Sequence, residues 1–167
     1  AAEAAPVQIS IYGQEKEGTT AGLARMNLVL HNKATAEIVG GSSTFSAPFF
    51  KKDGDDGAIR QFDFVVVNPP FSDKNWTHGL QEYDRFDGYG ERPPQKNGDY
   101  AWLLHVIKSL KRNGKAAVIL PHGVLFRGNA EAAIRQSIVD RGLIKGIIGL
   151  PPNLFYGTGI PACIIII

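Results

Sequence analysis

Cysteine is nearly absent from this 167-residue chain, in which Cys163 is the only thiol. One cysteine excludes an internal disulfide framework and a zinc site built from several thiolates, so we expect no metal site. It is consistent with a reducing compartment, and the cytoplasm is the expected location. An excess of one charge is also missing, because 18 Lys and Arg face 16 Asp and Glu. The net charge of +2 provides no strongly basic field, so any contact with nucleic acid must be argued locally.

Long hydrophobic runs are missing as well. No apolar stretch approaches the ~18 residues that a membrane span requires. The alanine-rich start lacks the basic and apolar regions of a signal peptide. We therefore expect no membrane partner. The run of isoleucines at residues 164–167 ends without a polar residue or turn, which leads us to expect a part of a longer polypeptide.

Short β-branched runs that end at glycine or proline alternate with stretches of helical periodicity. The predicted strands cover residues 7–12, 36–39, 62–67, 115–120, 143–150 and 162–167, and the predicted helices cover residues 20–31, 100–111 and 130–141. This alternation is typical of an α/β fold with a mainly parallel sheet. The last strand can pair antiparallel with its predecessor.

Four further segments carry local predictions. Residues 62–67 are almost continuously apolar, which is typical of a strand covered on both faces of a parallel sheet. Residues 51–57 are polar and glycine-rich, which predicts a solvated loop. Residues 72–98 form an irregular connection of a length found mainly in binding loops or disordered segments. Asp99 is a plausible N-cap for the helix that follows.

The most unusual strand end is Asn68-Pro69-Pro70-Phe71. Ligands of open α/β sheets bind at the carboxyl ends of the strands, so this position is a candidate site. Prolines lack an amide donor and have a fixed φ, so they end the strand and leave carbonyl oxygens beyond the sheet edge. The Asn68 side-chain oxygen and the Pro69 carbonyl then form two fixed acceptors. Phe71 adds a flat apolar face.

Two acceptors beside an aromatic ring suit a planar amine. The amino group of a nucleobase is conjugated with its ring, and gripping both of its hydrogens favours a more pyramidal, nucleophilic nitrogen. Stacking on the aromatic contributes about 1–3 kcal/mol, which offsets much of the cost of removing a base from a duplex. A bare Asn-Pro-Pro is more often only a strand-ending turn. The buried strand before it and the aromatic after it favour the functional interpretation.

At this motif the sequence resembles the amino-group DNA methyltransferases that use S-adenosylmethionine. The surrounding sequence narrows the likeness to the modification subunit of type I restriction-modification systems. Supporting stretches are residues 12–15 (YGQE), 23–28 (LARMNL), 123–128 (GVLFRG) and 149–163 (GLPPNLFYGTGIPAC). The resemblance runs from about residue 7 to the end. It implies a Rossmann-like methyltransferase fold, incomplete at its N-terminal side, with residues 1–167 forming part of a catalytic domain.

The resemblance assigns roles to the strand-end residues. Asn68 and Pro69, with Pro70 completing the motif, hold the target amine, and Phe71 stacks on the flipped adenine. Phe155 matches a second aromatic around the base, although a hydrophobic plug under its loop is an equally good interpretation. Asn68 also lies beside the cofactor.

Two residues near the start of the chain match the cofactor side of the family. Glu15 matches the acid that binds the ribose hydroxyls of S-adenosylmethionine, which a carboxylate can do through two hydrogen bonds. The alternative is an exposed charge near a helix start. Ser42 stands where the family has an acidic or amide residue near the cofactor adenine, and this departure weakens the assignment. The family's glycine-rich cofactor loop has no counterpart in residues 1–6, so we expect these 167 residues alone to bind S-adenosylmethionine weakly or not at all.

Several other residues are weaker candidates. His122 follows a strand, but the transferred amine needs no histidine base, and a structural role is favoured. Arg127 is a candidate for approaching DNA. Basic residues interleaved with aromatics in residues 72–98 either follow phosphates or belong to a solvated loop; they are Lys74, Arg85, Arg92 and Lys96. Cys163 opens a β-branched strand and is expected to be a small buried hydrophobe.

The function that the resemblance implies is methyl transfer from S-adenosylmethionine to the amino group of adenine in DNA. The implied partners are DNA, a specificity subunit and a restriction subunit. The nearest rival is an Asn-Pro-Pro methyltransferase that acts on RNA or on a protein glutamine, whose planar amide presents the same two hydrogens. A non-catalytic module that docks on DNA or on subunits is the alternative from a different class.

Overall fold

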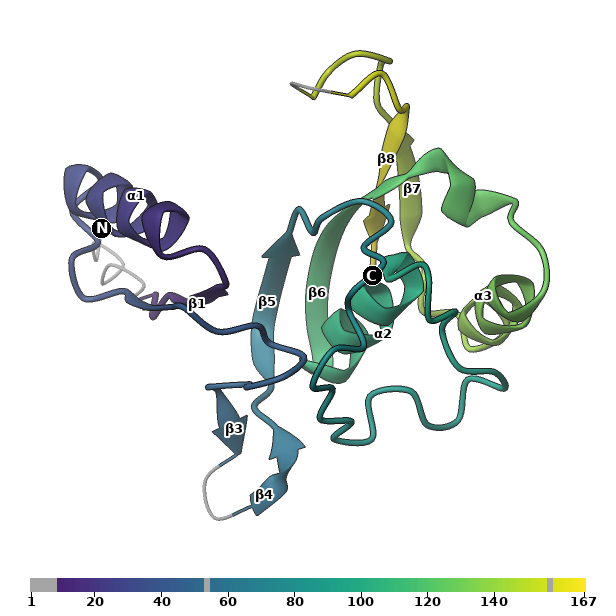
Figure 1. Ribbon diagram of the computed structural model, residues 1–167, viewed down its shortest axis with the longest axis horizontal. Coiled ribbons are helices and arrows are strands. Elements are labelled where there is room, and N and C mark those ends of the chain that lie inside the picture. The colour runs from purple at the N-terminus through teal and green to yellow at the C-terminus, as the bar shows by residue number, and fades with distance from the viewer. Residues whose placement is uncertain (1–8, 53–54, 156–157) are drawn as a thin grey trace, which may run out of the picture. The chain divides into compact units, whose positions relative to one another are not determined.

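A computed structural model describes residues 9–52, 55–155 and 158–167 (Figure 1). The chain forms two compact units, residues 1–49 and residues 50–167. The elements in chain order are β1 (Tyr12–Glu15), α1 (Gly18–Leu30), β2 (Glu37–Gly40), β3 (Lys51–Lys52), β4 (Asp55–Ile59), β5 (Phe62–Val67), α2 (Asp99–Lys108), β6 (Leu110–Pro121), the 3₁₀ helix η1 (His122–Leu125), α3 (Ala130–Asp140), β7 (Gly146–Gly149) and β8 (Ala162–Ile166).

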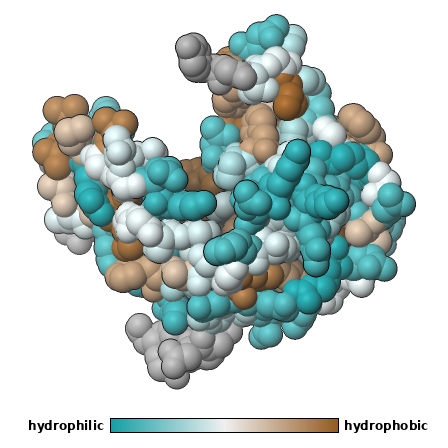
Figure 2. Space-filling model, viewed as in Figure 1, coloured by the Kyte–Doolittle hydropathy of each residue, from teal (hydrophilic) through white to brown (hydrophobic). Residues whose placement is uncertain are grey.

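The first unit is a β-α-β arrangement. β1 and β2 pair in parallel over four residues, from Tyr12 opposite Glu37 to Glu15 opposite Gly40. Helix α1 lies close to β2, because a Cβ on Gly40 would come within 2.9 Å of the Ala21 Cβ. Apolar residues on the rest of α1 remain exposed, as Figure 2 shows at the left of the view. The prediction of a helix here is confirmed.

The strand predicted at residues 7–12 is placed too early. Residues 7 and 8 lie outside the described residues, residues 9–11 are not part of a strand, and β1 begins at Tyr12. Its extent is set by its partner, because the Glu37 amide donates to the Ile11 carbonyl and the Gly41 amide donates to the Glu15 carbonyl. A four-residue partner strand limits β1 to the glycine-containing stretch.

The second unit contains a four-stranded sheet in the order β5-β6-β8-β7. β5 and β6 are parallel, whereas β8 runs antiparallel to both β6 and β7. The prediction of a mainly parallel sheet with an antiparallel last strand is therefore confirmed. On β6 the buried side chains alternate, and they belong to Ala116, Val118 and Leu120. Cys163 is buried in β8 as expected, and its burial raises the pKa of its thiol.

One face of β5 is open. Phe64 is 75% exposed and Val66 is 83% exposed. The prediction that residues 62–67 are covered on both faces is wrong for the described residues. An apolar run indicates that a strand favours burial on both faces. In the described part of the chain, other residues pack against only one face of β5.

Two further boundaries differ from the predictions. Residues 51–57 were expected to be a solvated loop, but β3 and β4 pair antiparallel on either side of residues 53 and 54, which lie outside the described residues. Helix α2 ends at Lys108 and β6 begins at Leu110, not at residue 115. The early start of β6 has a physical reason, because Leu110 pairs with Phe62 and the Phe62 amide donates to the Ser109 carbonyl. None of the helices in the described residues is long and apolar enough to cross a membrane.

Candidate active site

The carboxyl end of β5 leads directly into Asn68-Pro69-Pro70-Phe71. The strand stops where the prolines begin, as expected for residues that cannot donate to a sheet. Pro69 is buried and Asn68 is exposed. Within the described residues, no hydrogen bond engages the Asn68 carboxamide. An exposed amide that follows a buried strand can accept a hydrogen bond from a substrate without first breaking one in the protein.

Phe71 and Phe155 form an aromatic pair. Their ring centroids are 5.5 Å apart and their planes meet at 81°, an edge-to-face arrangement. Phe71 follows β5, and Phe155 lies in the connection between β7 and β8. The structure thus brings together the two aromatic residues that the sequence nominated separately. Their role toward a base stays a prediction.

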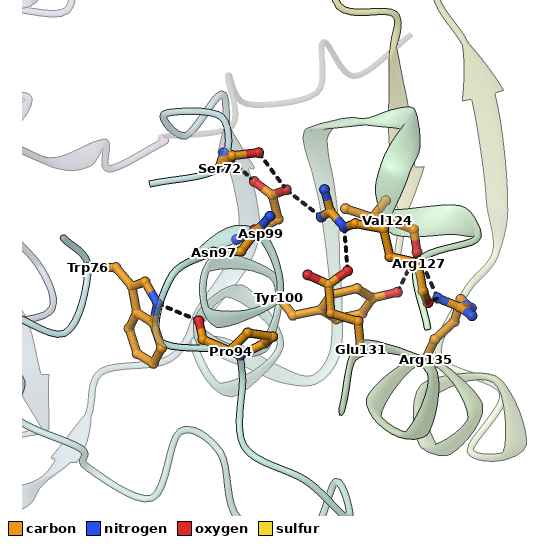
Figure 3. A network of polar contacts seen from close by, with 10 residues as sticks. All are labelled: Ser72, Trp76, Pro94, Asn97, Asp99, Tyr100, Val124, Arg127, Glu131 and Arg135. Atoms are coloured by element: carbon orange, nitrogen blue, oxygen red, sulfur yellow. Dashed lines mark hydrogen bonds and ion pairs between the residues drawn. The ribbon is translucent and has the colours of Figure 1, made fainter. Parts of the chain in front are cut away.

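The residue after the motif is fixed by a buried carboxylate. The Ser72 amide donates to Asp99 Oδ1 at 2.7 Å, and the Ser72 hydroxyl lies 3.4 Å from Asp99 Oδ2 (Figure 3). Asp99 was predicted to cap α2, but the N-cap is Gly98 and Asp99 is the first residue of the helix. Its carboxylate does not cap the helix but accepts hydrogen bonds from Ser72, in the loop that follows β5. Sequence reasoning missed this contact, because the two residues are 27 positions apart.

Arg127 bridges two carboxylates. Its Nη2 lies 2.5 Å from Asp99 Oδ2, and its Nε lies 2.5 Å from Glu131 Oε2 (Figure 3). Burial opposes the charge of Arg127, but hydrogen bonds to Glu131 and Asp99 outweigh it and raise the pKa of the guanidinium. The guanidinium is thus engaged by two carboxylates of the protein while the side chain stays 28% exposed, and the role of Arg127 toward DNA stays a prediction.

The loop that contains Arg127 is also tied to two helices. The Val124 carbonyl accepts hydrogen bonds from the Tyr100 hydroxyl at 2.6 Å and from Arg135 Nη1 at 3.1 Å. Arg135 donates in addition to the Arg127 carbonyl at 2.9 Å. Figure 3 shows these contacts between α2, η1 and α3. The segment after β6 is thereby fixed beside the segment after β5.

The long connection at residues 72–98 has a packed interior. Trp76 and Phe86 meet edge to face with centroids 5.5 Å apart, and Trp76 Nε1 donates to the Pro94 carbonyl at 3.0 Å. Arg85 is fully buried, so neither of its two interpretations, a contact with phosphates or a place in a solvated loop, fits this residue. Burial lowers the pKa of its guanidinium. Arg92 is exposed and paired with Glu82.

Two cationic candidates of this loop, Lys74 and Lys96, remain exposed. Exposed ammonium groups can reach a phosphate at little desolvation cost, whereas a buried guanidinium cannot. Their role in contacting DNA stays a prediction.

Of the three residues nominated for the cofactor, Glu15 and Ser42 lie in the first unit and Asn68 lies in the second. β1 and β2 are parallel and end together, so Glu15 and Ser42 reach the same sheet edge, where the Gly41 amide donates to the Glu15 carbonyl at 3.0 Å. Glu15 Oε1 accepts the Glu17 amide at 2.9 Å. A carboxylate offers about four acceptor positions, so this contact leaves room for the two hydroxyls of a ribose. The free acceptor positions of the Glu15 carboxylate therefore fit the ribose of a nucleoside, and this role stays a prediction.

Ser42 is less free to act. Its hydroxyl accepts a hydrogen bond from Gln14 Nε2 at 2.9 Å, and Gln14 also donates to the Ala47 carbonyl at 2.8 Å. Gln14 therefore holds the loop after β2 in place. A hydroxyl that already accepts one hydrogen bond can still donate one, so Ser42 remains compatible with a contact to a base.

His105 of α2 provides a prediction about pH. Burial, with a smaller contribution from the nearby positive charge of Arg85, lowers the pKa of His105 from 6.5 to about 3. The folded protein keeps His105 neutral while the unfolded chain takes up a proton below pH 6.5, so acid favours unfolding. We expect the free energy of unfolding to fall by about 1–2 kcal/mol between pH 7.5 and pH 5 through this residue alone.

The measurement is chemical unfolding of the full-length protein across this pH range. In His105→Gln the loss on acidification should be smaller by that amount, while His78→Gln, which changes an exposed histidine, should leave the loss unchanged. Equal pH dependence in all three proteins would contradict the assignment.

Comparisons with known proteins identify the fold and the family of the chain. A solved methyltransferase subunit of a type I restriction-modification system from Streptococcus thermophilus matches with a TM-score of 0.81 and 37% identity, covering 95% of this chain and 33% of that one. The fold is that of the class I S-adenosylmethionine-dependent methyltransferases. A model of the N-6 DNA methylase family matches residues 2–167, and the chain belongs to this family.

Curated relatives point the same way. The chain is 36% identical over 157 residues to the type I restriction enzyme HindI methylase subunit of Haemophilus influenzae, covering 93% of this chain and 34% of that protein. It is 34% identical over 159 residues to the MjaIX methylase subunit of Methanocaldococcus jannaschii, covering 92% of this chain and 27% of that protein. The chain thus spans about a third or less of the length of these relatives.

Proposed function

We propose that the chain is part of the catalytic domain of a type I methylase subunit that transfers a methyl group from S-adenosylmethionine to the amino group of adenine in DNA. The observation that carries this proposal is the exposed Asn68 carboxamide beside Pro69 and the Phe71–Phe155 pair, in a chain of the N-6 DNA methylase family. A specificity subunit and a restriction subunit complete the proposed complex. Because chromosomal DNA is the substrate, the complex acts in the cytoplasm.

The residues of the motif act on the amine. The Asn68 side-chain oxygen and the Pro69 carbonyl each accept one hydrogen of the adenine amino group, which draws the nitrogen lone pair out of conjugation with the ring. Phe71 holds the flipped base by stacking, and Phe155 holds Phe71. The cofactor supplies an electrophilic methyl group on a sulfonium. With the cofactor bound, the amine held by Asn68 and Pro69 would receive the methyl group while the sulfur kept the bonding electrons, and the methylated nitrogen would release its surplus proton to water.

Glu15 and Ser42 serve the cofactor in this proposal. Glu15 would accept hydrogen bonds from the two ribose hydroxyls, and the hydroxyl of Ser42 would contact the adenine of the cofactor. Both residues lie at the carboxyl ends of parallel strands, where nucleotide ligands bind in α/β folds.

Product analysis tests the proposal. The full-length protein is expressed with its specificity subunit in a host that lacks DNA methylation, and nucleic acids and protein are hydrolysed and analysed by mass spectrometry. The expected product is N6-methyladenine in DNA. Methylated RNA with unmodified DNA would support the RNA alternative, methylglutamine would support the protein alternative, and no new methylation would support a docking module.

A further inference from the structure

The Asn-Pro-Pro-Phe motif has few anchors of its own. Pro69 and Pro70 have no amide hydrogen, so they cannot be held by main-chain donation. Directly after Phe71, the backbone amide of Ser72 donates a hydrogen bond to Asp99, and this bond fixes the loop. Ser72 has a φ of +52°, a left-handed conformation that a non-glycine residue keeps only where its surroundings hold it. The position of the motif therefore depends on this contact.

Asp99 is suited to hold a strained residue. Its side chain is completely buried, so its charge must be compensated inside the protein. Arg127 supplies the compensation at Oδ2, which leaves Oδ1 to accept the Ser72 amide. Hydrogen bonds to an ionised acceptor are stronger and more directional than neutral ones. Glu131 in turn compensates Arg127 from α3.

We infer that Asp99 is a positioning residue for methyl transfer: its buried carboxylate holds Ser72, and through Ser72 it sets the position of Asn68 and Phe71 toward the substrate. The inference rests on the proposed function of the motif. The same carboxylate binds Arg127, which follows η1, so the loops after two neighbouring parallel strands, β5 and β6, are joined at one point. Asp99 itself touches no substrate.

Replacement of Asp99 in the full-length protein, assembled with its partner subunits, tests the inference. Asp99→Ala removes both acceptors, and we expect kcat for transfer of a labelled methyl group to unmethylated DNA to fall at least about tenfold, the usual cost of a hydrogen bond to a charged group. The KM for S-adenosylmethionine should stay within about twofold, because Glu15 and Ser42 belong to the other unit. Asp99→Asn keeps an oxygen toward Ser72 but loses the charge that strengthens the hydrogen bond, so its kcat should lie between that of Asp99→Ala and that of the parent, clearly below the parent value.

Glu131→Gln is the matched control. It neutralises the other carboxylate that binds Arg127, is equally buried, and makes no contact with Ser72. If Asp99 only stabilises the fold, Glu131→Gln and Asp99→Asn should lower kcat equally once each rate is divided by the folded fraction from circular dichroism. If Asp99 positions the motif, kcat should fall in the Asp99 variants and remain near the parent value in Glu131→Gln.

The outcomes separate the two levels of the argument. Where Asp99→Ala fails to fold, the comparison of Asp99→Asn with Glu131→Gln decides alone, and an equal kcat in the two overturns the inference. An unchanged KM with a lower kcat in the Asp99 variants supports it. Full activity of an Asn68→Ala protein would overturn the proposed function itself, whereas an inactive Asn68→Ala with a fully active Asp99→Ala overturns only the positioning role.

Discussion

Replacing Asn68 with alanine should lower methyl transfer by the full-length protein about a hundred- to a thousandfold, the effect expected when one preorganised hydrogen-bonding group is removed from a reacting centre. The amine would then be held by the Pro69 carbonyl alone, and its lone pair would remain conjugated with the ring. The effect should appear in kcat more than in KM, because the contact matters most as the nitrogen changes geometry. Asn68 is exposed, so the substitution should leave stability unchanged.

The assay is transfer of a labelled methyl group to unmethylated DNA under single-turnover conditions. The control is Asn113→Ala, which removes another exposed asparagine at the opposite end of the sheet, near the start of β6. Its activity should match that of the parent. A rate in Asn68→Ala above about a tenth of the parent rate would contradict the role of the carboxamide.

The position of the motif could be predicted because its signals are local. An apolar β-branched run stopped by two prolines defines both the strand and its end, and β5 covers the predicted residues 62–67. The alternation of strands and helices similarly predicted the sheet class. The antiparallel β8 followed from a connection that is turn-rich and has no helical pattern.

The surroundings of the motif could not be predicted, because they depend on contacts distant in sequence. The position of Asp99 before an apolar helical stretch predicts a helix cap. In the folded chain its carboxylate instead accepts a hydrogen bond from the Ser72 amide. Arg85 and Arg127 were both candidates for contacts with DNA, yet Arg85 is buried and the guanidinium of Arg127 is paired with Asp99 and Glu131. The sequence does not show whether a charged side chain is exposed, because a buried carboxylate such as Asp99 can pair with an arginine in the folded chain.

Boundaries differed where pairing overrode local preference. Residues 51–57 contain glycine and aspartate, which also suit a hairpin, and β3 pairs with β4 although neither strand is apolar. At Leu110, pairing with Phe62 ends α2 earlier than helical periodicity suggests. In both cases the boundary depends on hydrogen bonds to a partner strand, which cannot be recognised from the neighbouring residues in the sequence.

Phe71→Ala should weaken productive binding of the target base about ten- to a hundredfold in kcat/KM, because a base stacked on an aromatic ring contributes about 1–3 kcal/mol. Phe155→Ala should have a smaller effect, since Phe155 meets the edge of Phe71 in an edge-to-face contact. If Phe155 acts by holding Phe71, the double variant should be little worse than Phe71→Ala alone. Independent contacts with the base would make the two losses multiply.

Phe126→Ala separates loss of stacking from loss of apolar surface. Phe126 is 75% exposed in the same unit, and its removal should leave kcat/KM unchanged. Phe71→Leu keeps apolar volume but removes the flat ring, so it should behave like Phe71→Ala if stacking is the contribution that matters. Thermal unfolding then addresses the other interpretation of Phe155. A hydrophobic plug under its loop predicts a lower melting temperature with normal kcat/KM, and that combination would contradict a role toward the base.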